Sequence, residues 1–209
     1  LTLRTTDKPI WVGVQSYKKP AKDARYPTPA EYRAQAYLSI IHGAKGLMWY
    51  GGSVQGGLFL APEEGHWNDL KKLAGELRDL SPILMGTSEK PPAVLPEDAP
   101  ISVAWKRTAS RSVLLCVNRG LEPHEVAIVV PAMKASTVRV LNEDRTLNIT
   151  AGRLQDRFEP LATHIYELSG PPSTAPVTQG SRVEINADGV MVINGRKMFP
   201  IGFTMPPPP

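Results

Sequence analysis

Short apolar runs alternate with longer amphipathic stretches in the first part of the chain. The run at 10–14, Ile-Trp-Val-Gly-Val, follows Pro9 and precedes a polar stretch, which predicts a strand buried on both faces, as in a parallel sheet. The run at 46–50, Gly-Leu-Met-Trp-Tyr, predicts a second such strand, ended by two glycines. A helix between two strands with short links predicts a βαβ unit with parallel pairing.

Two helices are predicted in this part of the chain. Thr28 is a suitable N-cap, Pro29 occupies the first helical position, and Glu31 completes a capping box. One face of this helix is apolar and consists of Ala34, Leu38 and Ile41, with Tyr37 beside them. Gly43 supplies the stop signal. A second amphipathic helix is predicted from the helical spacing of Leu70, Leu73, Leu77 and Leu80. We expect it to end before Pro82.

The pattern changes in the second half of the chain. Residues 86–100 are rich in proline and polar residues, which is typical of a linker. Over 101–168, short β-type runs separated by turn residues predict an antiparallel β-sandwich. A second linker is predicted at 169–180, a β-hairpin that opens a further module at 181–204, and a proline tail at 205–209.

The composition of the chain limits the kinds of binding partner that can be predicted. The net charge is +4, and the basic residues are scattered, so no nucleic-acid partner is predicted. The chain lacks an apolar segment long enough for a membrane-spanning helix, and no membrane partner is predicted. Cys116 lies in an apolar run and is expected to be buried. There is no zinc-type Cys/His spacing, phosphate loop or dinucleotide fingerprint, so neither a metal nor another cofactor is predicted.

Three segments together carry a resemblance. They are 8–15 (Lys-Pro-Ile-Trp-Val-Gly-Val-Gln), the stretch from 25–31 (Arg-Tyr-Pro-Thr-Pro-Ala-Glu) to 42–50 (His-Gly-Ala-Lys-Gly-Leu-Met-Trp-Tyr), and 156–160 with 164–166. Roughly over 5–168, the chain resembles the C-terminal part of bacterial glycoside-hydrolase-like proteins, in which a TIM barrel related to β-galactosidases precedes a β-sandwich. Residues 192–203 resemble the opening strands of a second such barrel.

The resemblance implies the fold class. It is α/β plus all-β: a partial (β/α) barrel segment, the last two βα units, over 1–85, followed by an antiparallel β-sandwich. The first two strands would be barrel strands seven and eight, and the parent protein would carry a further module.

Barrel enzymes place reacting groups at the carboxyl ends of strands and in the following loops. That rule selects Gln15, Tyr17, Trp49, Tyr50, Glu63, Glu64 and Trp67. Aromatic rings stack on the apolar faces of sugars, so we expect the aromatic residues among these, with Gln15, to bind carbohydrate. For Trp49 the alternative is core packing at the strand end, and for Trp67 it is a cap on the following helix.

The catalytic assignment follows from the carboxylates. Most glycosidases use two carboxyl groups that flank the scissile bond. The resemblance implies a nucleophilic glutamate at the end of strand seven, where this chain has Gln15, whose amide is neither nucleophile nor base. Strand four, which would carry the acid, is absent. Glu63 and Glu64 are therefore the candidate catalytic residues, and adjacent carboxylates raise one another's pKa. The alternative is a solvated acidic loop.

Three functional hypotheses remain open. The leading one is a fragment of a glycoside-hydrolase-like protein that binds or acts on carbohydrate, with an incomplete catalytic site. The second is a small hydrolase that uses Glu63, Glu64 or His66, and the third is a structural sandwich without a ligand. Because two barrel units cannot close a barrel, we expect residues 1–85 to pack against the sandwich, or a homodimer to cover the open barrel edge.

Overall fold

The chain folds into two units, of which the first joins residues 1–81 to 178–209 and the second takes in 82–177. The structure is a computed structural model, and it describes residues 9–18, 25–50, 64–130, 137–169, 183–193, 195–197, 199 and 201–203. The order of elements is α/β first and all-β afterwards, as the sequence predicted.

A three-stranded parallel sheet organises the first unit. Its strands are β1 (Trp11–Gln15), β2 (Gly46–Tyr50) and β15 (Ile201–Phe203), with β2 in the middle. The two predicted strands and their parallel pairing are confirmed. The sequence did not predict the pairing of β15 with β2, because β15 comes from the stretch expected to open a further module. The assignment of 181–204 to such a module stays a prediction.

Two helices, α1 (Pro29–Ile41) and α2 (Glu64–Leu84), accompany the sheet. The capping box of α1 is confirmed, because the Thr28 hydroxyl accepts from the Glu31 N–H and the Glu31 carboxylate accepts from the Thr28 N–H. The predicted end of α2 before Pro82 is wrong. A proline removes only one helical hydrogen bond there, and the burial of Ile83 and Leu84 offsets that loss. Neither helix is long and apolar enough to cross a membrane.

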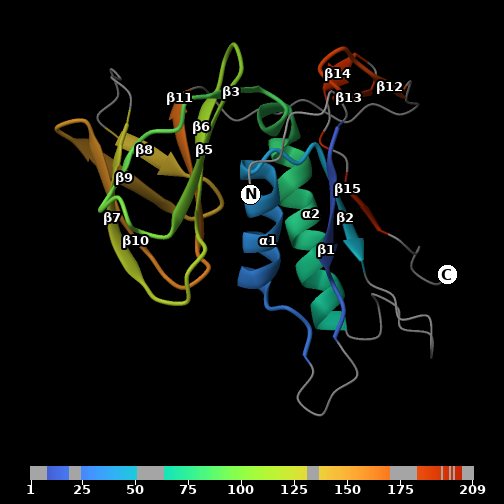
Figure 1. The fold of residues 1–209 in the computed structure, drawn as a ribbon, viewed down its shortest axis with the longest axis horizontal. Helices are drawn as coiled ribbons and strands as arrows, with labels where there is room; N and C mark the ends of the chain where they lie inside the picture. The colour runs from blue at the N-terminus through green and yellow to red at the C-terminus, as the bar shows by residue number, and fades with distance from the viewer. Residues whose placement is uncertain are drawn as a thin grey trace. The chain divides into compact units, whose positions relative to one another are not determined.

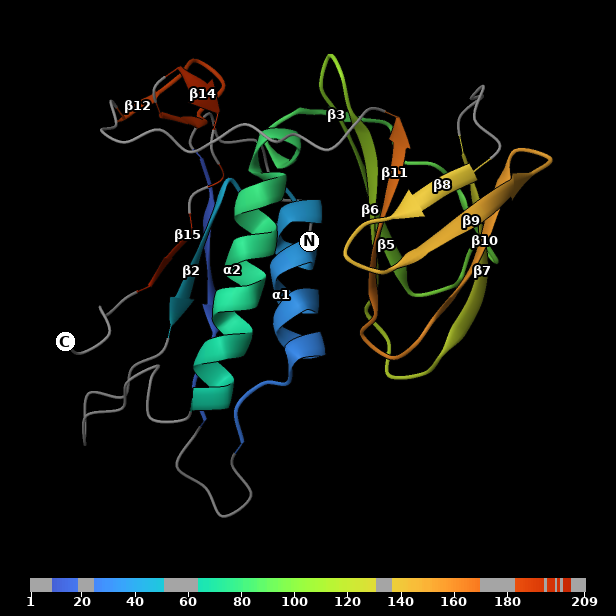
Figure 2. The same cartoon turned by 180° about the vertical axis from the view of Figure 1, so that it is seen from behind.

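The helices run side by side and lie on one face of the sheet (Figure 1 and Figure 2). Glu76 of α2 links them, since its carboxylate accepts from the Arg33 guanidinium at 3.0 Å and from the Tyr37 hydroxyl at 2.5 Å. The side chains buried in this unit include Tyr32, Tyr37, Ile40, Leu47, Trp49, Leu70 and Leu77.

A small antiparallel sheet completes the first unit. It consists of β12 (Val183–Ile185), β13 (Met191–Ile193) and β14 (Arg196–Lys197), which confirms the hairpin predicted around 186–189. The Asn186 side chain accepts from the N–H groups of Asp188 and Val190, which holds the turn.

One continuous nine-stranded sheet forms the second unit. Its strands are β3 (Thr87–Glu89), β4 (Val94–Leu95), β5 (Ile101–Arg107), β6 (Ser112–Asn118), β7 (His124–Val129), β8 (Thr137–Val140), β9 (Arg145–Thr150), β10 (Arg153–Phe158) and β11 (Thr163–Ser169). The spatial order is β3-β5-β6-β11-β8-β9-β10-β7-β4, and the pairing is antiparallel throughout.

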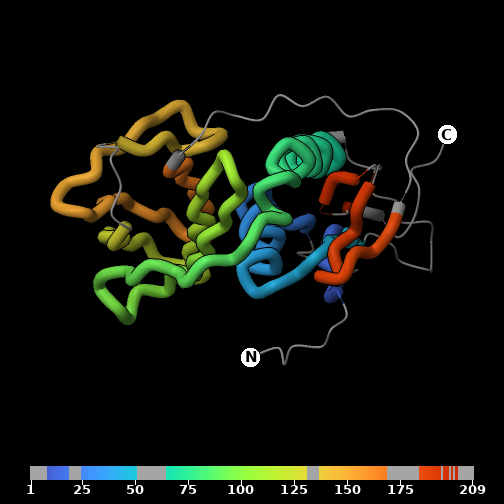
Figure 3. The backbone as a smooth tube through the Cα atoms, turned by 90° about the horizontal axis from the view of Figure 1, so that it is seen from above, coloured from blue at the N-terminus to red at the C-terminus, as the bar shows by residue number. Residues whose placement is uncertain are grey.

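This sheet differs in two respects from the prediction. The predicted sandwich implied separate sheets, whereas here β8, β9 and β10 connect the two flanks and the sheet curls around its core (Figure 3). Two strands, β3 and β4, lie within the stretch expected to be a linker, and they pair with β5 and β7. The core contains Cys116, which is fully buried as expected. Burial raises the pKa of its thiol.

Candidate functional site

The sheet of the first unit has one face that its helices do not cover. Successive side chains of a strand point to opposite faces, and Trp11, Met48 and Tyr50 all point away from the helices. They are 43, 37 and 48% exposed, respectively. The parallel register places Gly13 beside Met48 and Gln15 beside Tyr50. We call the exposed positions Trp11, Gly13, Gln15, Met48 and Tyr50 the open face.

Trp49 lies on the opposite face of the same strand. Its side chain has no exposed surface, and Val14 and Leu47 are buried beside it on the helix side of the sheet. The sequence left the role of Trp49 open between sugar contact and core packing. A ring in this position packs in the core, and it would have to be uncovered before it touched a ligand.

Three of the predicted binding residues meet at the carboxyl ends of β1 and β2. The rings of Tyr17 and Tyr50 are nearly perpendicular, at an interplanar angle of 83° and a centroid distance of 5.6 Å. Gln15 lies across the strand pair from Tyr50, and its side-chain amide donates to the Tyr17 carbonyl at 2.8 Å. None of the described residues donates to the Gln15 side-chain oxygen. We call Gln15, Tyr17 and Tyr50 the aromatic corner.

The aromatic corner has the chemistry of a sugar contact. The ring of Tyr50 offers an apolar surface, and the Gln15 oxygen can accept a hydrogen bond from a hydroxyl group. The hydrogen bond to Tyr17 orients the Gln15 amide. No formal charge is present in the corner.

The other predicted residues lie on or before α2. Trp67 is in its first turn and half-buried, and the Lys71 ammonium lies 6.0 Å from its ring centroid. Glu64 begins α2, but its side chain lies outside the described residues, as does all of Glu63. The candidate catalytic pair therefore stays a prediction.

His66, a candidate residue of the small-hydrolase hypothesis, lies between two tyrosines near the amino ends of the helices. The ring of Tyr26 stacks on His66 at a centroid distance of 3.9 Å, and the Tyr32 hydroxyl is 2.8 Å from His66 Nδ1. Burial raises the pKa of Tyr32, which therefore stays a neutral hydroxyl. Tyr32 and His66 are 34 positions apart in the sequence, and Tyr26 is farther still from His66. The fold brings them together, and no local sequence signal could have predicted the contact.

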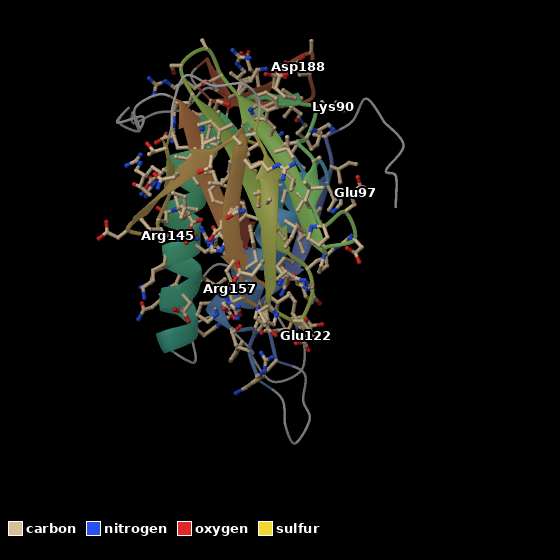
Figure 4. All side chains as sticks on the ribbon, turned by 90° about the vertical axis from the view of Figure 1, so that its left-hand side faces the viewer. Lys90, Glu97, Glu122, Arg145, Arg157 and Asp188 are labelled. Carbon is tan, nitrogen blue, oxygen red and sulfur yellow. The ribbon has the colours of Figure 1, made fainter. Side chains whose placement is uncertain are left out.

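The second unit contains a polar cluster of its own, which sequence patterns did not predict. Arg145 (Figure 4) donates to both carboxylate oxygens of Asp156 at 2.8 Å. The Tyr166 hydroxyl donates to Asp156 at 2.6 Å, and His164 Nδ1 is 2.6 Å from Glu143. Each of these polar groups has its hydrogen-bond partner within the cluster, which is typical of a structural network.

The electrostatics of this cluster favour its charged form. Burial alone would raise the pKa of Asp156, but the hydrogen bonds from Arg145 and Tyr166 outweigh burial and leave that pKa below its usual value. Burial likewise opposes the ionisation of Glu143, and the contacts with His164 and Arg145 lower its pKa overall. Among the residues that the structure describes, no three His, Cys, Asp or Glu side chains gather in a way that could hold a metal ion.

Comparison with known proteins gives a likeness of fold. No known protein family matches the sequence. No curated protein matches it either.

Solved structures of glycoside hydrolases do match. The α-amylase of Geobacillus thermoleovorans in complex with acarbose gives a TM-score of 0.54 at 15% identity, over 76% of this chain and 38% of that one. An Anoxybacillus α-amylase gives a TM-score of 0.52 at 15% identity, over 69% of this chain and 33% of that one. AmyP in complex with maltose gives a TM-score of 0.51 at 13% identity, over 70% of this chain and 36% of that one.

These matches support a glycoside-hydrolase-like fold at low sequence identity. This chain spans between 33 and 38% of the length of the three matched structures.

Proposed function

We propose that this chain is a part of a glycoside-hydrolase-like protein that binds carbohydrate at the aromatic corner and has an incomplete catalytic site. The observation that carries the proposal is the arrangement of Gln15, Tyr17 and Tyr50, in which two perpendicular rings and an oriented amide meet at the carboxyl ends of parallel strands. Related folds bind ligands at that end of the strands. The fold-level likeness to proteins solved with maltose and acarbose supports carbohydrate as the ligand class.

Binding without turnover follows from the residue at the end of β1. An amide cannot attack an anomeric carbon or take a proton from water, so Gln15 cannot serve as one of the two carboxyl groups that glycoside hydrolysis uses. Its role in the proposal is to accept a hydrogen bond from a sugar hydroxyl while Tyr50 stacks on the ring.

Calorimetric titration of the full chain with malto- and cello-oligosaccharides tests this proposal. We expect Tyr50→Ala to raise the Kd by about tenfold or more, because truncation of an aromatic anchor costs about 2 kcal/mol of binding free energy. Leu121→Ala is the matched control, since Leu121 is 75% exposed and belongs to the second unit. Equal affinities for the native chain and Tyr50→Ala would contradict the proposal.

The alternative of a small hydrolase is tested with the same protein. Turnover of an aryl glycoside that disappears in Glu63→Gln or Glu64→Gln would favour that alternative, in which His66 and its partner Tyr32 could relay a proton. Sugar binding without turnover favours the proposal. If the chain shows neither sugar binding nor turnover, the result favours a structural role.

A homodimer that covers the free edge of β1 is also part of the proposal. Among the described strands, β1 pairs with β2 alone, and a free parallel edge is a template for association. Light scattering that gives the mass of a single chain would contradict the dimer.

A further inference from the structure

We propose that Gln35 of α1 is a positioning residue for the aromatic corner, which holds the Gln15 backbone so that the Gln15 amide faces the sugar. This inference rests on the proposed function and extends it, because it adds a helix residue to a site otherwise built from strand ends. The Gln35 side-chain oxygen accepts from the Gln15 backbone N–H at 3.2 Å. The two residues are 20 positions apart, and the strand-end rule does not point to a residue in the middle of a helix.

The Gln15 N–H needs a partner from outside the β1–β2 pair. The next N–H along the chain, that of Ser16, donates to the Tyr50 carbonyl at 3.0 Å. Successive N–H groups of a strand point in opposite directions, so the Gln15 N–H points away from β2. Among the described strands, β1 pairs only with β2, and Gln35 supplies the acceptor in place of a further strand. The last residue of β1 is therefore anchored to α1.

The helix presents Gln35 from a well-packed position. Ala34 and Ala36, on either side of it, are buried, and Gln35 itself is partly buried. The Ser39 hydroxyl donates to the Gln35 backbone carbonyl at 2.7 Å. A partly buried side chain on a packed helix has lost much of its rotamer freedom already, so its hydrogen bond to Gln15 costs little further conformational entropy. Gln35 thus acts as a preorganised acceptor.

Two hydrogen bonds then hold Gln15, one at its backbone and one at its side chain. The backbone N–H donates to Gln35, and the side-chain amide donates to the Tyr17 carbonyl at 2.8 Å. With both nitrogens held, the side-chain oxygen keeps one orientation and can accept from a sugar hydroxyl. Sugar binding therefore has less ordering of the Gln15 side chain to overcome. Loss of the Gln35 acceptor should weaken sugar binding through Gln15.

Calorimetric titration of full-chain variants with malto- and cello-hexaose tests the inference. Gln35→Met keeps the length of the side chain but has no oxygen, and we expect it to raise the Kd by about three- to tenfold, the effect of one lost hydrogen bond. Gln35→Glu keeps an acceptor and should bind within about twofold of the native chain. Gln155→Met is the matched control, because Gln155 is exposed and belongs to the second unit.

A double-mutant cycle separates positioning from a general loss of stability. In a Gln15→Ala background, Gln35→Met should raise the Kd no further, because the side chain that it positions is gone. A merely structural role would lower the melting temperature and weaken binding in both backgrounds. If Gln15→Ala binds too weakly to measure, the comparison of Gln35→Met with Gln35→Glu decides.

The outcomes separate the role of Gln35 from the proposed function. If no oligosaccharide binds the native chain, the proposed function fails and the role of Gln35 fails with it. If Tyr50→Ala weakens binding but Gln35→Met binds as tightly as the native chain, only the role of Gln35 is overturned. The same holds if Gln35→Glu loses as much affinity as Gln35→Met, or if Gln35→Met keeps its full effect in the Gln15→Ala background.

Discussion

Neighbouring residues of one short strand have opposite roles in this protein. Tyr50 and Trp49 are both aromatic and both close to the carboxyl end of β2, yet 48% of Tyr50 is exposed and none of Trp49. The alternation of side chains across a strand accounts for the difference, because one residue faces the helices and the next faces away. The residue type suggested sugar binding for both. The face of the sheet supports it for Tyr50.

At the same scale, the polar cluster around Asp156 predicts how stability depends on pH. The pKa values of Asp156 and Glu143 are lowered in the folded chain. Their contribution is therefore complete above the unfolded pKa values of about 4, and it is lost as pH falls below them. We expect the second unit to lose stability between about pH 5 and pH 2. Thermal melting followed over that range measures the effect.

Asp156→Asn isolates the contribution of one carboxylate. It removes the charge that Arg145 and Tyr166 contact, so we expect a loss of about 2 kcal/mol of unfolding free energy at pH 7 and a shallower decline toward acid. Glu159→Gln is the control, because its ion pair with Arg157 is exposed, and the melting temperature should not change. The same acid dependence in native chain and Asp156→Asn would show that the cluster is not responsible.

At the scale of elements, we expect alanine substitutions at two glycines near α2 and β3 to have opposite effects on stability. Gly75 lies inside α2, and a Cβ atom there would meet nothing within 4 Å. Gly75→Ala should stabilise the chain by about 0.5–1 kcal/mol, because alanine is the better helix former. Gly86 lies between α2 and β3, and a Cβ atom there would overlap the Arg107 carbonyl. Gly86→Ala should therefore destabilise by about 1–3 kcal/mol.

Chemical denaturation of both variants measures these effects. Because both substitutions add the same methyl group, the sign of the change depends only on its surroundings. A stabilising Gly86→Ala, or a Gly75→Ala that destabilises by more than about 1 kcal/mol, would contradict the packing described here.

Local signals in the sequence sufficed for some elements and failed for others. The capping box at Thr28 and Glu31 and the apolar runs of β1 and β2 depend on nearby residues, so their elements were predictable. The prediction at Pro82 was wrong because it used a local stop signal. The helix continues because Ile83 and Leu84 are buried in the folded chain, which a local signal does not reveal. The partner of β15 could not be predicted, since β2 lies about 150 positions away and three residues carry no pairing pattern of their own.

At the scale of the whole molecule, the two halves of the chain were predicted to differ in class, and they do. What the sequence could not specify was connectivity. The single curled sheet depends on β8, β9 and β10 joining its flanks, and on β3 and β4 pairing with strands beyond their own neighbours. The candidate site was predictable in part for the same reason. Gln15, Tyr17 and Tyr50 follow from the ends of strands, whereas the contact of Tyr32 with His66 depends on how the helices pack.

The central claim is that the aromatic corner binds carbohydrate. The most direct test is a two-dimensional NMR titration of the full chain with a malto- or cello-hexaose, in which the ring C–H signals of the six tyrosines are followed. We expect a saturable shift of the Tyr50 ring signals, with those of Tyr166 in the second unit unchanged. Tyr50 signals that stay in place at saturating sugar, or shifts of equal size at Tyr50 and Tyr166, would contradict the claim.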